Sequence, residues 1–204
     1  MTNTGNASTL TTSGYAPVDG LEMYYEIHGT PQEGRLPLVL LHGAFSSIQP
    51  DFALMLPIFA RTRQVIAIEQ QAHGHTRDID RPLRGELMAD DTAALLRHLG
   101  VPKADLFGYS MGGNVAMLVA ARHPELVRKL VLAGGTSYSL EGLHPGMMDG
   151  MEGMTADALN GTPWKEDYDK VAPDPGAFAT LFAKKNEMDR HTQSWTPEQV
   201  SALQ

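Results

Sequence analysis

Nearly continuous apolar runs alternate with longer amphipathic stretches along most of the chain. The apolar runs lie at residues 36–41, 64–68, 104–107 and 130–134. Short runs of this kind are typical of strands that are covered on both faces, as in a parallel sheet. The pattern therefore predicts a buried strand at each of these positions.

Helical periodicity fills the intervals between these runs. Residues 51–62 carry apolar side chains at helical spacing, and Pro57 is expected to break or kink that helix. Residues 88–99 present one apolar face and are followed by Gly100, whereas residues 114–122 are apolar on nearly all sides. Strands that alternate with helices predict right-handed βαβ units. The expected fold class is therefore α/β, a mostly parallel sheet with helices on both faces.

The pattern changes at both ends of this region. Residues 1–14 are rich in Thr, Asn, Ser and Gly, and we expect them to form a mobile tail. Residues 15–28 alternate apolar and polar positions around a turn at residues 18–21, which predicts a β-hairpin. We expect one α/β core over residues 15–135 and a helical lid or cap region over residues 136–204.

The lid assignment depends on a change in composition after residue 135. Glycines, prolines and acidic residues surround several methionines, and a helical pattern follows at residues 176–189. The methionines in question are Met147, Met148, Met151 and Met154. Methionine adapts to irregular apolar space, so this region reads either as a lid that lines an apolar pocket or as a loosely packed α-hairpin with methionine as core filler.

Composition narrows the function classes. The 204 residues carry a formal net charge of -8 and no cysteine. An acidic chain without a basic cluster argues against nucleic acid as a partner, and the absence of cysteine excludes disulfides, Cys metal ligands and a Cys nucleophile. No apolar run approaches the roughly 20 residues of a membrane span, and the N-terminus lacks a signal pattern. We expect a cytoplasmic protein that binds neither nucleic acid nor membrane.

The candidate chemistry lies where the third apolar run ends. The sequence there reads Gly108-Tyr109-Ser110-Met111-Gly112, and a helical run follows. A G-x-S-x-G sequence between strand and helix is typical of a nucleophile elbow, in which the glycines let neighbouring backbone pass. At a helix N-terminus, free N–H groups and the helix dipole favour a developing negative charge. The pattern predicts acyl transfer with Ser110 as nucleophile; the alternative is a turn whose serine merely caps the helix.

These features together resemble the α/β-hydrolase fold family, in its esterase, C–C hydrolase and haloperoxidase-like branch. The resemblance covers residues 15 to about 135. It rests on four matches in the right order: the β-rich arm at residues 21–27, the apolar strand that ends in His42-Gly43, the strand that leads into a Gly74-centred loop, and residues 108–113.

The resemblance implies roles for specific residues. The backbone N–H groups of Ala44 and Met111 would form an oxyanion hole, and each such donor is worth about 3 to 4 kcal/mol in known cases. Gly108 and Gly112 would be the elbow glycines. The edge of the substrate pocket would be formed by His42, Gly43, Phe45 and Tyr109. The substrate would be a small apolar or aromatic molecule, and no cofactor is implied.

The histidines near this site are interpreted as structural. His42 follows a strand, and the resemblance makes it a structural or pocket-edge residue rather than the general base. In the loop at residues 69–76, His73 and His75 flank a glycine without a third ligand at a recognisable spacing, so no metal site is expected. The same loop departs from the common Asp and Arg of the family at residues 69–71.

A serine nucleophile needs a base and an acid that orients the base. The order in this fold is serine, acid, histidine, and the resemblance places the last two after a seventh and an eighth strand. We expect those strands, and with them the acid and base, to be absent before Gln204. The candidates within the chain are the bases His123, His144 and His191 and the acids Glu141, Asp149 and Asp189. The pair Glu141 and His144 stays open as an alternative.

The absence of two strands would have a structural consequence. The strand at residues 130–134 would become an unpaired apolar edge, so we expect self-association through that edge or poor stability. Two functions remain open. The first is a serine hydrolase that acts on small apolar esters or related acyl and C–C substrates through a Ser110 acyl-enzyme, with its acid and base beyond residue 204. The second is a non-catalytic ligand-binding or interaction protein, or an inactive fragment, that keeps the elbow without the triad.

Overall fold

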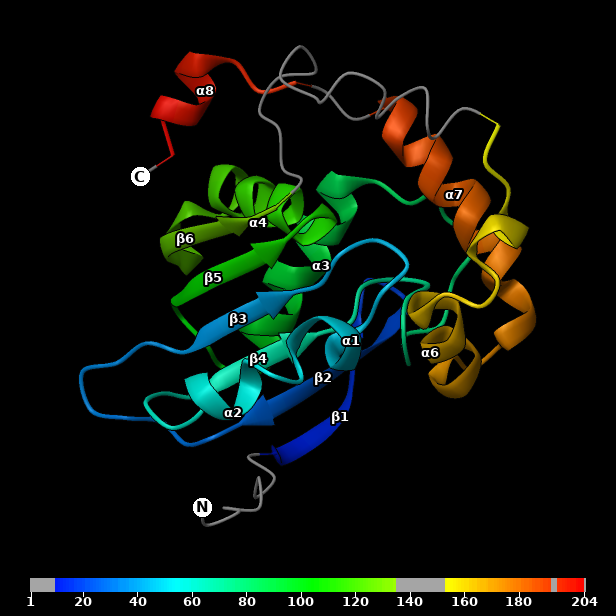
Figure 1. Ribbon diagram of the computed structural model, residues 1–204. Coiled ribbons are helices and arrows are strands. Elements are labelled where there is room, and N and C mark those ends of the chain that lie inside the picture. Colours follow the sequence, from blue (N-terminus) through cyan, green and yellow to red (C-terminus); the bar gives the residue numbers. More distant parts are fainter. Residues whose placement is uncertain (1–9, 135–152, 192–193, 204) are drawn as a thin grey trace.

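A computed structural model describes residues 10–134, 153–191 and 194–203 of the chain (Figure 1). Within these residues, six strands form one sheet in the order β1-β2-β4-β3-β5-β6. The strands are β1 (Leu10–Val18), β2 (Leu21–His28), β3 (Leu38–Leu41), β4 (Val65–Ile68), β5 (Ala104–Tyr109) and β6 (Val127–Ala133). β3, β4, β5 and β6 pair in parallel, whereas β1 and β2 pair antiparallel. The predicted α/β class is confirmed.

Helices cover the sheet on both faces (Figure 1). They are α1 (Ile48–Phe52), α2 (Leu56–Phe59), α3 (Gly85–His98), α4 (Met111–Arg122), α6 (Pro163–Val171), α7 (Phe178–His191) and α8 (Pro197–Ser201), with 3₁₀ turns η1 (Pro124–Leu126), η3 (Ala156–Leu159) and η4 (Pro175–Ala177). The break expected at Pro57 is confirmed, because two short helices replace one and Pro57 lies in the first turn of the second.

The two faces of the sheet bury two separate apolar clusters. Alternate residues of β3 and β4 point to opposite faces, as the period of a strand requires. One face, with Val39, Leu41, Ile66 and Ile68, packs against α3 and α4. The other, with Leu38, Leu40, Val65 and Ala67, packs against α1 and α2. All eight side chains are buried, which explains why the sequence runs here are apolar without alternation.

The first strand begins earlier than the sequence pattern predicts. Thr12, Ser13 and Gly14 pair with β2, so the assignment of residues 10–14 to a mobile tail is wrong; residues 1–9 lie outside the described part of the chain. The side chains of Thr12 and Ser13 are exposed, and this end of the strand pairs with β2 through its backbone. The hairpin turn is confirmed: Asp19 and Gly20 have φ of 47° and 86°, the positive values of a type I′ turn.

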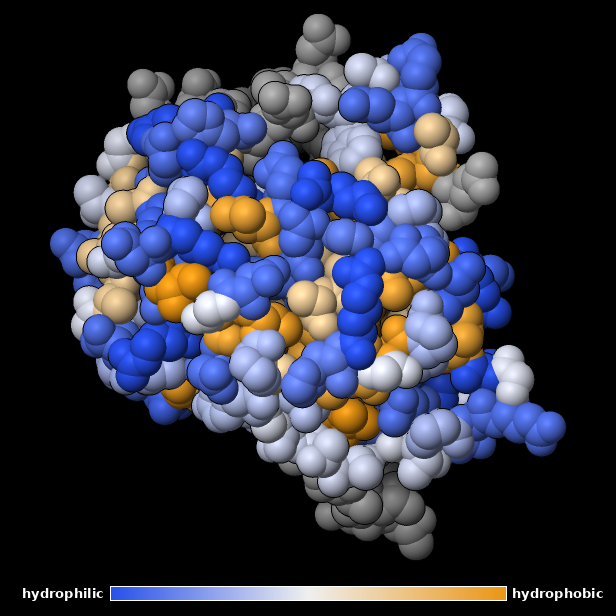
Figure 2. All heavy atoms as spheres, turned by 180° about the vertical axis from the view of Figure 1, so that it is seen from behind, coloured by the Kyte–Doolittle hydropathy of each residue, from blue (hydrophilic) through white to orange (hydrophobic). Residues whose placement is uncertain are grey.

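β6 is the last strand of the sheet within the described residues. It starts at Val127, before the apolar run at residues 130–134, and Val127 is its only buried residue. Val131 and Leu132 are 50% and 42% exposed. The face of the molecule in Figure 2 shows several small apolar patches interrupted by hydrophilic side chains, as is common on protein surfaces. Self-association through β6 stays a prediction.

The region after residue 152 is helical where it is described. Figure 1 shows α6 and α7 beside the ends toward which the strands of the parallel sheet point. Met154 is 39% exposed, and the other three methionines of the expected lid lie outside the described residues. The assignment of residues 136–204 to a lid stays a prediction. No helix in the described residues is both long enough and apolar enough to cross a membrane.

Candidate active site

Ser110 lies at the corner between β5 and α4. Its φ of 52° and ψ of -118° fall in a region that residues with a side chain rarely adopt, at a cost of about 1–3 kcal/mol. Surrounding hydrogen bonds hold this conformation. The Ser110 N–H donates to the carbonyl oxygens of Ala133 (3.0 Å) and Gly134 (3.1 Å), and the Ser110 carbonyl accepts from the N–H of Gly113 (2.9 Å). The strand, strained turn and helix that the sequence pattern requires are therefore present.

No side chain larger than hydrogen fits at the two elbow glycines, Gly108 and Gly112. A Cβ added at Gly108 would lie 2.3 Å from the carbonyl oxygen of Gly112, and one added at Gly112 would lie 2.1 Å from that of Leu41. Both contacts are with backbone, which cannot rotate away as a side chain can. Glycine at these positions lets α4 start directly against β3 and β5.

The loop after β3 touches the elbow. The register pairs Leu41 with Gly108, so the residues that follow each strand meet at one edge of the sheet. A Cβ added at Gly43 would lie 3.3 Å from the Ser110 Cβ and 3.2 Å from the ring of Tyr109. Gly43 and Gly108 are 65 residues apart in the sequence, and the structure brings the two segments that carry them into contact.

Two backbone N–H groups in the segments that meet at Ser110 have no hydrogen-bond partner among the described residues. Within the described residues, the structure gives the N–H of Ala44 no hydrogen-bond partner. Met111 is the first residue of α4, and the N–H groups of a first helical turn have no partner within the helix. Unsatisfied N–H groups at a helix N-terminus attract negative charge. These two donors are the ones the resemblance assigns to an oxyanion hole, an assignment that stays a prediction.

Both ring nitrogens of His42 are hydrogen-bonded to backbone. Its side chain is buried; Nδ1 lies 2.7 Å from the carbonyl oxygen of Gly43, and Nε2 lies 3.1 Å from the nitrogen of Gln70. Because a backbone N–H must donate, Nε2 is the acceptor and Nδ1 carries the proton. With both ring nitrogens occupied, His42 orients the loop after β3 and is not placed to accept a proton from Ser110.

Phe45 connects the loop after β3 to α7. Its φ of 61° is unusual for a bulky residue. Its ring stacks on Phe182, with centroids 5.5 Å apart and planes at 18°, and lies 6.1 Å from the ring of Phe178. A polar contact reinforces the packing, because the Ser47 hydroxyl donates to Asp167 of α6 at 2.6 Å. Tyr109, in contrast, is 42% exposed, and the pocket-edge roles of these residues stay predictions.

The loop at residues 69–76 is a buried polar support. Glu69 is 1% exposed and accepts from the N–H of Ile48 (3.3 Å) and from the N–H and Nδ1 of His75 (2.5 and 2.9 Å). The hydrogen bond that the His75 ring donates to the Glu69 carboxylate raises the pKa of His75. Burial lowers the pKa of His73 to about 3, and its Nδ1 lies 2.8 Å from the carbonyl oxygen of Gln71. The sequence pattern identifies this loop, but it does not indicate that the Glu69 carboxylate accepts hydrogen bonds from Ile48 and His75.

Metal coordination has no support in the described residues. They contain no group of three or more His, Cys, Asp or Glu side chains that could hold a metal ion. In the loop at residues 69–76, the two histidines bond to backbone and to a carboxylate of the same loop.

The candidate bases and acids that the structure describes are engaged elsewhere. His123 follows the last residue of α4, at the end of the helix opposite Ser110, and its Nε2 lies 2.8 Å from Asp90. His191 lies 2.7 Å from Glu187, and Asp189 accepts from Lys185 at 2.5 Å. The remaining candidates, Glu141, His144 and Asp149, lie outside the described residues.

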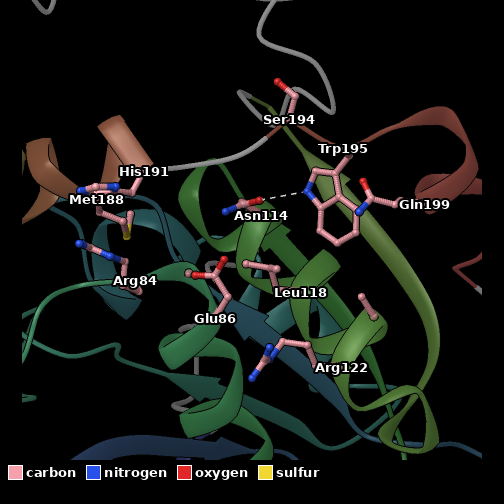
Figure 3. A pocket seen from close by; sticks show the side chains of 12 residues that line it. Arg84, Glu86, Asn114, Leu118, Arg122, Met188, His191, Ser194, Trp195 and Gln199 are labelled. Carbon is pink, nitrogen blue, oxygen red and sulfur yellow. Dashed lines mark hydrogen bonds between the residues drawn. The ribbon is translucent and has the colours of Figure 1, made fainter.

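A cavity that sequence reasoning did not find lies on the flank of α4 (Figure 3). It has a volume of about 270 Å³, and its lining does not include Ser110. The indole N–H of Trp195 donates across it to Asn114 at 3.4 Å. Residues that line the cavity include Arg84, Glu86, Asn114, Leu118, Met188 and Trp195. The cavity therefore lies along α4, the helix that follows Ser110, and not over the serine itself.

Comparisons with known proteins agree with this arrangement. Residues 37–197 match the family model described as alpha/beta hydrolase fold. The chain is 36% identical over 106 residues to 2-hydroxymuconate semialdehyde hydrolase of Pseudomonas sp. strain CF600, an alignment that covers 50% of this chain and 38% of that protein. It is 31% identical over 137 residues to serine hydrolase BPHL of Mus musculus, covering 65% and 46%. The chain thus spans less than half the length of these curated relatives.

A solved structure shares the fold over nearly the whole chain. The crystal structure of a membrane phospholipase A, a bacterial virulence factor, superposes with a TM-score of 0.77 and 21% sequence identity. The match covers 96% of this chain and 67% of that one. At this identity the likeness concerns the fold alone.

Proposed function

The chain belongs to the alpha/beta hydrolase fold family, and from that membership we propose that it is a serine hydrolase with Ser110 as its nucleophile. The observation that carries the proposal is the conformation of Ser110. A serine with φ of 52° between a parallel strand and a helix has a conformational cost that a simple helix cap does not need. Strain of this kind is concentrated at functional sites.

The proposed reaction is acyl transfer. The Ser110 oxygen attacks the carbonyl carbon of the substrate, its proton passes to a base, and the carbonyl oxygen becomes an oxyanion. The N–H groups of Ala44 and Met111 donate to that oxyanion, each contributing about 3 to 4 kcal/mol to the transition state. Departure of the leaving group produces an acyl-enzyme, which water then hydrolyses. The positive end of the α4 dipole favours the same negative charge.

The proposed base and acid are none of the described histidines considered above, nor the carboxylates paired with them. His42 is bonded to backbone through both ring nitrogens, and His123 and His191 are paired with carboxylates. A base either among the residues that the structure does not describe or beyond residue 204 fits the chain order of serine, acid and histidine. An acid–base pair made of Glu141 and His144 is one such arrangement.

The substrate we propose is a small apolar or aromatic ester, or a related acyl or C–C compound. The support is the aromatic group of Phe45, Phe178 and Phe182, which packs where α7 meets the loop after β3. Apolar and aromatic walls with few polar groups are typical of small-molecule pockets. In this proposal α6 and α7 act as a lid that covers the loop beside Ser110.

Hydrolysis of p-nitrophenyl butyrate by the purified protein tests the proposal. Turnover should require Ser110, so Ser110→Ala should reduce kcat by at least about 10³-fold, while circular dichroism shows an unchanged fold. Equal turnover by Ser110→Ala would overturn it, and so would no turnover of any short ester by a folded wild-type chain that includes its acid and base. The second result would favour a non-catalytic member of the family that keeps the elbow.

A further inference from the structure

One carboxylate holds both ends of the turn that carries Ala44. Asp51 lies in α1, and its Oδ2 accepts a hydrogen bond from the N–H of Gly43 at 2.7 Å. Its Oδ1 accepts from the hydroxyl of Ser46, also at 2.7 Å. Hydrogen bonds to a carboxylate are shorter and about twice as strong as those between neutral groups. Asp51 therefore spans the turn from its first residue to its last.

The remaining hydrogen bonds of this turn are satisfied internally. The carbonyl oxygen of Gly43 accepts hydrogen bonds from His42 Nδ1 at 2.7 Å and from the N–H of Ser46 at 3.4 Å. Gly43 and Ser46 are buried, so water is not available to replace a lost partner. Among the described residues, the N–H of Ala44 is left with no partner inside the turn or outside it.

The conformation of the turn needs external support. Phe45 has φ of 61°, which a bulky side chain rarely adopts and which persists only where the surroundings fix it. The platform that provides this support is rigid. Ile48 and Phe52, which flank Asp51 on α1, are both fully buried, and the N–H of Ile48 donates to Glu69.

We infer that Asp51 is a positioning residue for catalysis: its carboxylate fixes the Gly43–Ser46 turn so that the Ala44 N–H points at the oxyanion. The inference rests on the proposed function of Ser110. Asp51 itself does not touch the reacting atoms, and its effect passes through the backbone. A donor displaced by the loss of this support stabilises the transition state less, while binding of the ground state is little changed.

Two substitutions of Asp51 separate positioning from simple structural loss. Asp51→Ala removes both acceptors, and we expect kcat for p-nitrophenyl butyrate to fall about 10- to 100-fold with KM within about twofold of wild type. Asp51→Asn keeps one acceptor oxygen for Gly43, and its amide can donate to Ser46, so kcat should stay within about threefold. Gln49→Ala, on the exposed side of the same helix, is the matched control and should leave kcat and KM unchanged.

The outcomes are distinguishable. A kcat for Asp51→Ala within about twofold of the Gln49→Ala control would overturn the inference. An equal loss of kcat in Asp51→Ala and Asp51→Asn, in proportion to the loss of folded protein, would also overturn it, because the role would then be structural only.

A second measurement does not depend on turnover. Amide exchange of Gly43, followed by NMR, should be about tenfold faster or more in Asp51→Ala than in wild type, because its N–H loses a charge-assisted partner. If the wild-type protein shows no Ser110-dependent turnover, the proposed function fails, and unchanged Gly43 exchange would separately refute the role of Asp51 in the turn.

Discussion

Substitution of Gly112 by alanine tests the packing that places Ser110. The added Cβ would lie 2.1 Å from the carbonyl oxygen of Leu41 and 2.7 Å from that of His42. The first separation is more than 1 Å below the roughly 3.5 Å at which non-bonded atoms make favourable contact. Leu41 belongs to β3, which pairs with β4 on one side and β5 on the other, so its carbonyl cannot move without disturbing two neighbours.

The expected cost follows from this geometry. Overpacking costs about 1–3 kcal/mol where neighbouring side chains can move aside. The backbone of Leu41 cannot move aside, so we expect Gly112→Ala to lower the free energy of unfolding by about 3 kcal/mol or more. Alanine gains about 1 kcal/mol in helix propensity, which offsets only part of this. In a chain of this length, a loss of about 3 kcal/mol corresponds to a decrease in Tm of roughly 6–12 °C.

Gly85→Ala is the matched control. Gly85 is also helical, but its added Cβ would meet the end of the Leu118 side chain at 2.7 Å, and that side chain can rotate away. We expect this variant to remain within about 1 kcal/mol of wild type. Urea unfolding followed by circular dichroism measures both. If Gly112→Ala lost less than about 1 kcal/mol, or no more than the control, the reasoning about backbone contact at the elbow would be refuted.

Three further predictions follow from other contacts. His73 has a pKa near 6.5 in the unfolded chain, whereas burial lowers it to about 3 in the folded protein, so the free energy of unfolding should fall by up to about 1.4 kcal/mol per pH unit as the pH drops through that interval. His73→Gln should reduce the pH dependence of the urea midpoint between pH 6.5 and 4.5, and an unchanged dependence would contradict this prediction. Phe182→Ala should lower the free energy of unfolding by about 3 kcal/mol, because it removes a buried ring that stacks on Phe45, and a loss below about 1 kcal/mol in urea unfolding would be inconsistent with that packing. Val131→Lys should shift a self-associating protein to monomer in sedimentation velocity, since Val131 is half exposed on β6, whereas equal association by the variant would exclude this edge.

The sequence predicts best where side chains alone decide the structure. The runs at β3 and β4 are buried on both faces, so their hydropathy is sufficient to identify them. The start of β1 is different. Thr12 and Ser13 are exposed, and their strand conformation comes from backbone pairing with β2, which leaves no trace in hydropathy.

The candidate site also contains features that the sequence predicts and features that it does not. The elbow around Ser110 is local, because the strained turn and its two glycines lie within five consecutive residues. Contacts between distant segments are not readable from spacing. The stacking of Phe45 on Phe182 joins the loop after β3 to α7, and no periodicity in either segment indicates it. Asp51 accepts hydrogen bonds from Gly43 and Ser46, which precede it in the sequence. The hydropathy pattern predicts a helix from residue 51, whereas α1 begins at Ile48.

The most direct test of the central claim is covalent labelling of Ser110. The purified, folded protein is treated with a fluorophosphonate probe, digested, and mapped by peptide mass, with Ser110→Ala and Ser47→Ala treated in parallel. If Ser110 is an activated nucleophile, wild type and Ser47→Ala should carry the probe on the peptide that contains Ser110, and Ser110→Ala should carry none. Absence of labelling in folded wild-type protein, or labelling that persists in Ser110→Ala, would contradict the account.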